Sequence, residues 1–249
     1  MIPLVIHFIW VSLNEQLPEL FKLCILSAVI ATRCKVVLHT DDASIQLPGV
    51  ETRIREFPKV INNTEFDPDE DVRHHFGRRV SHLKDVVRLQ ILHEEGGIYS
   101  DLDVLWLKHP WFLLNYRVVI GYQAKAYRTL CNAVMMAEPG HQAIKDYLDW
   151  TISIYPPRRY WIPANPFKLW RTKEYLQELT YVERSEFFGR QYTDDGDYLF
   201  EKLHKATAIH LYYSIQKRIG GEVIETMAKR IEEELKVTLP REFTLRDQN

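Results

Sequence analysis

The beginning of the chain alternates between short apolar segments and one longer segment with helical spacing. Residues 4–10 (LVIHFIW) and 35–39 (KVVLH) are short and almost continuously apolar, which is typical of fully buried strands. Between them, residues 18–32 start with a proline and carry dense apolar residues at helical spacing. A strand, a helix and a strand in this order predict a parallel sheet covered by helices. This feature places the chain in the α/β class.

Length and charge restrict the possible functions. The chain has 249 residues, of which 46% are hydrophobic and 27% are charged, which is ordinary for a globular protein with a large core. A formal net charge of −2 argues against a protein that binds the nucleic-acid backbone. We expect a single domain over residues 1–249, with residues 221–249 as a C-terminal helical tail. The apolar residues of the tail lie on one helical face, which we expect to pack on the domain rather than on a partner: Ile224, Met227, Ile231 and Leu235.

Cysteine usage and the N-terminal sequence indicate a compartment. Cys24, Cys34 and Cys131 are scattered and lack C-x-x-C spacing, which argues against a disulfide framework or a structural zinc site. The opening residues MIPLVIHFIW are apolar but contain His7, and they are much shorter than the ~20 residues of a membrane span. We therefore expect a soluble, cytoplasmic protein without a signal peptide or a membrane anchor.

The remaining sequence continues the alternation of strands and helices. Strand-like segments are residues 51–57, 98–107, 117–123, 132–138 and 206–213. Helical segments are residues 81–97, 143–155, 171–179 and 222–235. Ser81 is the expected N-cap of the first of these helices, and Gly96-Gly97 its end. The polar residues 58–79 predict a long surface loop, which is uncommon unless it is functional or mobile.

Two carboxylates, Asp101 and Asp103, interrupt the apolar segment 98–107. If this segment is one strand, its period of two places both side chains on the same face. Two adjacent acids repel each other unless a cation neutralises them, and Mg²⁺ or Mn²⁺ suits carboxylate oxygens and substrate phosphates. The pair therefore predicts a metal–phosphate substrate; two solvated acids in a turn are the alternative.

The helix that precedes these acids carries another charged pair. Asp85 and Arg88 are three residues apart and so lie on one helical face, which borders the core. They could form a local ion pair. They could also bind a ligand, with Asp85 accepting a sugar hydroxyl and Arg88 contacting phosphate or sugar oxygens.

Residues 81–104, SHLKDVVRLQILHEEGGIYSDLDV, are similar to the signature of the DXD-containing glycosyltransferases, roughly S-D-x-x-R-y-x-x-L-y-x-x-G-G-I-Y-x-D-x-D. This family includes initiating α-mannosyltransferases, capsular-polysaccharide transferases and clostridial glucosylating toxins. The segments IPLVIHFIW, CNAVMMAEPGHQ and AIHLYYSIQK resemble its first strand and two of its later segments. The resemblance implies a GT-A-like fold, with a mixed, mostly parallel central sheet flanked by helices.

The resemblance also implies roles for individual residues. Trp10 would border or stack on the nucleotide base, with core packing as the alternative. Asp103 would be the direct metal ligand, Asp101 would contact ribose or metal-bound water, and His210 would add a third ligand. Asn132 would face the donor sugar or the acceptor.

Further donor contacts follow from the same resemblance. Asp85 and Arg88 would bind the donor, and Arg88 would act in catalysis together with Asp101 and Asp103. The final tryptophan of the family pattern is absent from YYSIQK, which leaves Ser214, Gln216 or Lys217 to contact the diphosphate.

The function implied is the transfer of a sugar from a UDP- or GDP-sugar to a glycan or another hydroxyl acceptor. It would depend on Mn²⁺ or Mg²⁺ and retain the stereochemistry of the donor, and polysaccharide biosynthesis is its setting in several relatives. One alternative is a haloacid-dehalogenase-type phosphohydrolase, because DLDV also fits a motif in which Asp101 would attack phosphate. Another is a catalytically silent sugar-binding protein on the same fold.

Overall fold

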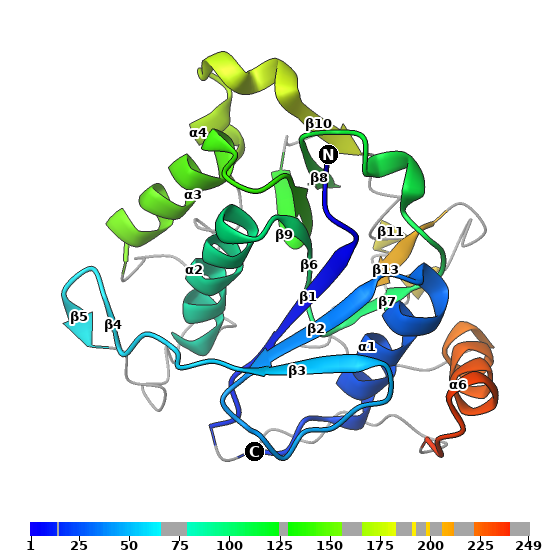
Figure 1. Cartoon of the computed structure of the whole chain (residues 1–249). Helices are drawn as coiled ribbons and strands as arrows, with labels where there is room; N and C mark the ends of the chain where they lie inside the picture. The colour runs from blue at the N-terminus through cyan, green and yellow to red at the C-terminus, as the bar shows by residue number, and fades with distance from the viewer. Residues whose placement is uncertain are drawn as a thin grey trace.

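The structure is a computed structural model that describes residues 1–13, 15–65, 79–124, 129–155, 166–182, 191–192, 198–199, 206–211 and 222–239. Its centre is a seven-stranded sheet with helices on both faces (Figure 1). The strands of this sheet are β1 (Val5–Trp10), β2 (Lys35–Thr40), β3 (Val50–Ile54), β6 (Gly97–Ser100), β8 (Val118–Ala124), β9 (Thr129–Ala137) and β10 (Leu179–Val182). Their order is β10-β8-β9-β6-β1-β2-β3.

Most neighbours in this sheet are parallel. β1 runs parallel to β2 and β6, β2 to β3, and β10 to β8, whereas β9 is antiparallel to both β6 and β8. The helices are α1 (Glu19–Thr32), α2 (Arg79–Glu94), α3 (Gln142–Ser153), α4 (Phe167–Trp170) and α6 (Glu222–Leu235), with 3₁₀ turns at Trp111–Leu113 and Glu174–Glu178. The predicted α/β architecture, with a mixed and mostly parallel sheet, is confirmed.

The β1–α1–β2 unit shows how the sequence builds both layers of the core. Alternate side chains of β1 point to opposite faces of the sheet. Phe8 belongs to the same apolar cluster as Ile25 of α1, and its neighbour Ile9 to the same cluster as Val87 of α2. Both faces of the strand are therefore buried, which explains why residues 4–10 are continuously apolar.

Helix α2 ends where the sequence predicts but begins earlier. It starts at Arg79, so the prediction that Ser81 is its N-cap is wrong; Ser81 lies inside the first turn. After the helix, Gly96 adopts a φ of +67°, and a Cβ there would lie 2.7 Å from the backbone nitrogen of Pro139. Only glycine satisfies both conditions without strain.

The segment predicted as one strand over 98–107 is two strands with a turn between them. β6 ends at Ser100 in the large sheet, and β7 (Val104–Trp106) pairs antiparallel with β13 (Ala208–His210). Both strands are fully buried, so the apolar sequence gives no sign of a break. The turn between them contains Asp101 and Asp103.

The C-terminal part of the described chain contributes helix α6, which lies beside α1 (Figure 1). Ile224, Met227 and Ile231 are buried in a cluster with Leu23 and Cys24 of α1. The helix predicted at 171–179 is replaced by the 3₁₀ turn at Glu174–Glu178 followed by β10. Two short hairpins complete the described elements, β4 (Val60–Ile61) with β5 (Thr64–Glu65) and β11 (Gln191–Tyr192) with β12 (Tyr198–Leu199). Among the described residues, no helix has the length and apolar character needed to span a bilayer.

Candidate functional site

The candidate site lies at one edge of the central sheet. The parallel strands β1, β2, β3 and β6 all end at this edge, and the antiparallel strand β9 starts there, because Ser100 is in register with Val134. The carboxyl ends of parallel strands are the usual place for ligands in open α/β sheets. Asp101, which follows β6, and Asn132, near the start of β9, lie at this edge.

Asp101, Asp103 and His210 form a cluster of possible metal ligands. One ligand atom from each lies within 4.8 Å of the others. The turn is closed by a hydrogen bond from the amide of Val104 to the carbonyl of Asp101 (3.2 Å), and the amide of Leu211 donates to the carbonyl of Asp103 (2.7 Å). The three side chains therefore meet because of the turn and the β7–β13 pairing. They do not meet because of the two-residue period of a strand, as the sequence predicted.

His210 and Asp103 form an ion pair in this cluster, with 3.2 Å between Nε2 and Oδ1. Burial alone lowers the pKa of His210, but the Asp103 carboxylate outweighs it and raises this pKa well above the ordinary value. The Asp103 carboxylate thus stabilises the protonated, positively charged form of His210. Two carboxylates and one imidazole are also a ligand set that suits Mn²⁺, so these residues fit a divalent ion.

Asp101 is held on one side by two donors. The hydroxyl of Tyr99 donates a hydrogen bond to Oδ1 of Asp101 (2.6 Å), and Nη2 of Arg88 lies 3.2 Å from the same oxygen. Asp103 has no such contact with Arg88 among the residues described. The two acids of the turn therefore have different partners, because Asp101 contacts Tyr99 and Arg88 whereas Asp103 contacts His210.

Arg88 connects α2 to both strands at the edge. Its side chain is buried, with a residue exposure of 4%. The guanidinium lies 3.1 Å from Asp85, donates from Nη1 to the carbonyl of Asn132 (2.7 Å) and stacks over the ring of Tyr99 at 4.4 Å. A buried guanidinium is stable only with such compensation. The local ion pair with Asp85 exists, but it is one part of a larger network.

Asn132 contacts Asp85, and its expected place facing the donor sugar or the acceptor stays a prediction. Its side chain is buried, and Nδ2 donates to Oδ1 of Asp85 (2.8 Å). Burial raises the pKa of Asp85, partly offset by Arg88. Burial likewise raises the pKa of Tyr147, which is hydrogen-bonded to Asn132. The Asn132 amide therefore holds Asp85 in place.

Trp10 ends β1 and is 8% exposed. Its ring meets Phe21 edge-on with centroids 6.1 Å apart, so core packing accounts for most of its surface. Its Nε1 is buried and has no hydrogen-bond partner among the described residues. Ser214, Gln216 and Lys217 lie outside the described residues.

Two residues at this edge are missed by the sequence reasoning. Tyr99 is part of the matched signature, but its hydroxyl contact with Asp101 follows only from the structure. Lys84 lies one helical turn before Arg88, and its charge interacts with those of Asp101 and Asp103. The four-residue spacing between Lys84 and Arg88, which places both on one helical face, could have indicated Lys84 from the sequence.

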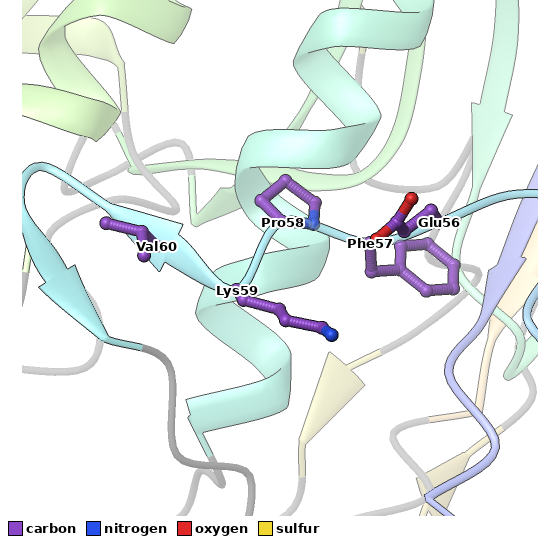
Figure 2. Close-up of a pocket in the computed structure, with 5 residues that line it drawn as sticks. All are labelled: Glu56, Phe57, Pro58, Lys59 and Val60. Atoms are coloured by element: carbon purple, nitrogen blue, oxygen red, sulfur yellow. The ribbon is translucent and has the colours of Figure 1, made fainter.

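A separate hollow of about 400 Å³ lies along the segment between β3 and β4, lined by Glu56, Phe57, Pro58, Lys59 and Val60 (Figure 2). The lining comes from one continuous stretch of chain and includes none of the three possible metal ligands. This hollow is therefore not part of the candidate site.

With this geometry established, the sequence can be compared with known families. Residues 18–125 match the family model of the glycosyltransferase sugar-binding region containing the DXD motif. This segment is similar to the sugar-binding region of the DXD-containing glycosyltransferases. The matched segment includes Asp85, Arg88, Asp101 and Asp103, whereas Asn132 and His210 lie beyond it. None of the curated proteins matches the chain.

Three solved structures illustrate what the chain resembles, and the two with a TM-score above 0.5 bear on its fold. The galactosyltransferase LgtC in complex with donor and acceptor sugar analogs is 13% identical, with a TM-score of 0.51 over 95% of this chain and 98% of the other. An active-site mutant of LgtC gives 12% identity and the same TM-score and coverage. The PaToxG glycosyltransferase is 16% identical with a TM-score of 0.47, and the alignment spans 66% of each chain. The two LgtC structures thus show that the chain has the GT-A fold that the sequence resemblance implies.

Proposed function

We propose that this protein transfers a sugar from a UDP- or GDP-sugar to a hydroxyl group of a glycan or another acceptor, and that it requires Mn²⁺ or Mg²⁺. The observation that carries the proposal is the cluster of Asp101, Asp103 and His210 next to the buried pair of Asp85 and Arg88. The cluster of Asp101, Asp103 and His210 suits a metal-bound diphosphate. The pair of Asp85 and Arg88 offers polar groups to a sugar.

In this proposal Asp103 and His210 are direct ligands of the divalent ion, and Asp101 contacts it directly or through water. When bound, such an ion supplies Lewis-acid stabilisation of the negative charge on the departing nucleoside diphosphate. Asp101 is already oriented by Tyr99 and Arg88, so little rearrangement is needed when the donor binds.

The remaining residues bind and orient the donor. Asp85, whose carboxylate is fixed by Asn132 and Arg88, accepts a hydrogen bond from a sugar hydroxyl. Trp10 borders the nucleotide base, and its buried indole N–H is a donor that a ligand could use. Ser214 and Lys217 contact the diphosphate, as the sequence resemblance implies.

Other parts of the proposal come from the sequence alone, either from the resemblance or from length, cysteine usage and the N-terminal segment. These are retention of the donor stereochemistry, a cytoplasmic location, a place in polysaccharide biosynthesis, and a single domain over residues 1–249. No side chain is assigned as a nucleophile.

The phosphohydrolase alternative requires Asp101 to attack phosphate. Oδ1 of Asp101 accepts a hydrogen bond from Tyr99 and lies in an ion pair with Arg88, and both contacts lower the nucleophilicity of the carboxylate. The motif also follows β6 rather than the first strand. Both observations favour glycosyl transfer.

The test is a binding panel of UDP, GDP, dTDP and CMP, each with Mn²⁺ and with a chelator, followed by thermal unfolding. A ligand at about 100 times its dissociation constant stabilises the fold by about 2.7 kcal/mol, or several degrees at about 2–4 °C per kcal/mol. We expect a Mn²⁺-dependent shift with UDP or GDP that Asp103→Asn abolishes. Asp149→Asn, at an exposed position of α3, should keep the shift. Unchanged affinity in Asp103→Asn would overturn the metal assignment.

A further inference from the structure

Helix α2 is partly open to solvent next to the metal cluster. Asp85 and Arg88 are buried, whereas Ser81 and Lys84, three residues apart, keep partial exposure. Lys84 lies one turn before Arg88 on the same helical face, and Nε of Arg88 donates to the carbonyl of Lys84 (3.3 Å). The side chain of Lys84 is therefore the accessible cation nearest in sequence to the buried Arg88.

The surroundings of Lys84 are rich in charge. Burial lowers the pKa of Lys84; Asp101, Asp103 and Asp85 act in the opposite direction, and Arg88 adds to the lowering. The ammonium itself has no ion pair or hydrogen bond within the part of the chain that the structure describes.

The acids that act on Lys84 already have other partners. Asp85 is bonded to Asn132 and Arg88. Asp101 accepts from Tyr99, and Asp103 pairs with His210. A half-buried ammonium is stabilised when an anion binds to it, and among the described residues no acid forms an ion pair with Lys84.

We propose that the ammonium of Lys84 binds the diphosphate of the nucleotide-sugar donor, beside the ion held by Asp103; this inference rests on the function proposed above. Lysine suits the role because its ammonium is a compact charge on a flexible stem, which can follow phosphate oxygens as the leaving group departs. The signature similar to residues 81–104 has serine at this position, so the charge is a feature of this chain.

The test compares Lys84→Met, which keeps the apolar stem, with Lys84→Arg and with Lys145→Met on the exposed surface of α3. Calorimetry measures the binding of UDP and GDP with Mn²⁺, and of uridine and guanosine as probes without phosphate. Electron paramagnetic resonance measures the binding of Mn²⁺ alone. We expect Lys84→Met to weaken binding of the diphosphate at least about tenfold, which corresponds to about 1.4 kcal/mol, and to leave nucleoside binding unchanged.

The affinity for Mn²⁺ alone separates a ligand contact from a structural role. Removing a positive charge beside two carboxylates should leave Mn²⁺ binding equal or tighter, whereas a lysine that only holds the acids in place would weaken both Mn²⁺ and diphosphate binding when it is lost. Lys84→Arg should stay within about threefold of the wild type, and Lys145→Met should be unchanged. Wild-type-like diphosphate binding by Lys84→Met, or parallel loss of Mn²⁺, nucleoside and diphosphate, would overturn the inference. Failure of the wild type to bind any Mn²⁺–nucleotide would overturn the proposed function instead.

Discussion

Nη2 of Arg88 lies 3.2 Å from Oδ1 of Asp101, which joins the middle of α2 to the turn after β6. The same nitrogen is 3.1 Å from Asp85, so one guanidinium compensates two acids that are both largely withdrawn from water. Removing one partner of such a buried pair costs more than the pair contributes, because the remaining charge keeps its desolvation penalty.

We expect Arg88→Met to lower the free energy of unfolding by about 3–5 kcal/mol. Arg230→Met, at a surface ion pair of α6, should lower it by less than about 1 kcal/mol. Urea unfolding followed by circular dichroism measures both. Equal losses in the two variants would show that the Arg88 network adds nothing beyond an ordinary surface pair.

Arg88→Lys tests geometry separately from charge. Lysine keeps the charge but cannot reach Asp85, Asp101 and the carbonyl of Asn132 at the same time. We expect a folded protein in which Mn²⁺-dependent turnover falls about tenfold or more, because a hydrogen bond to a charged group contributes about 1.5–3 kcal/mol. Turnover at the wild-type level in a donor-hydrolysis assay would contradict this expectation.

Tyr99→Phe removes one hydroxyl and keeps the ring under Arg88. Asp101 then loses the 2.6 Å hydrogen bond to its Oδ1, while the ring stays buried and stacked. We expect turnover to fall about tenfold, with a loss of about 1 kcal/mol in stability. Tyr116→Phe, at an exposed position, is the matched control and should change neither quantity.

The fold was predictable to the extent that its elements have local signals. The β1–α1–β2 unit and the end of α2 follow from apolar spacing and from Gly96. The turn at Asp101 and Asp103 was not visible, because buried strands on both sides of it give one continuous apolar run.

The site was predictable in its composition but not in its assembly. Asp103 and His210 are far apart in the sequence and meet because β13 pairs with β7. The role of Asn132 depends on the distance between α2 and β9, which no local pattern encodes. The proposed role of Lys84 could not be predicted from a local pattern either, because it depends on the nearby charges of Asp101 and Asp103.

The buried histidines of β1 and β2 predict a dependence of stability on pH. Nδ1 of His7 and Nε2 of His39 are 3.0 Å apart, so one ring donates to the other. Burial lowers the pKa of His7 to about 4, with Glu95 opposing and Arg53 and Lys35 adding to the effect. Burial and the neighbouring His7 lower the pKa of His39 to about 3.

The sign of this effect follows from proton binding. Between pH 6.5 and about 4 the unfolded chain binds more protons than the folded protein, so stability falls as the pH falls through this window. His7 alone accounts for a loss of up to about 3 kcal/mol. Urea midpoints at several pH values should fall less steeply in His39→Gln than in the wild type.

Helix α6 provides a test of whether the C-terminal helix unfolds together with the sheet. Ile231 is fully buried in the cluster that contains Leu23 of α1, and α1 in turn supports β7 through the hydrogen bond from the amide of Trp106 to Ser27 (2.9 Å). We expect Ile231→Ala to lower the free energy of unfolding by about 2–5 kcal/mol because it creates a cavity. Glu225→Ala, on the exposed face of α6, should have little effect on the free energy of unfolding.

If residues 1–249 form one domain, intrinsic fluorescence and circular dichroism will report one coincident transition in both variants. A separate early transition in Ile231→Ala, with Mn²⁺–nucleotide binding retained after it, would show that α6 is an independent unit and that the donor site forms without it.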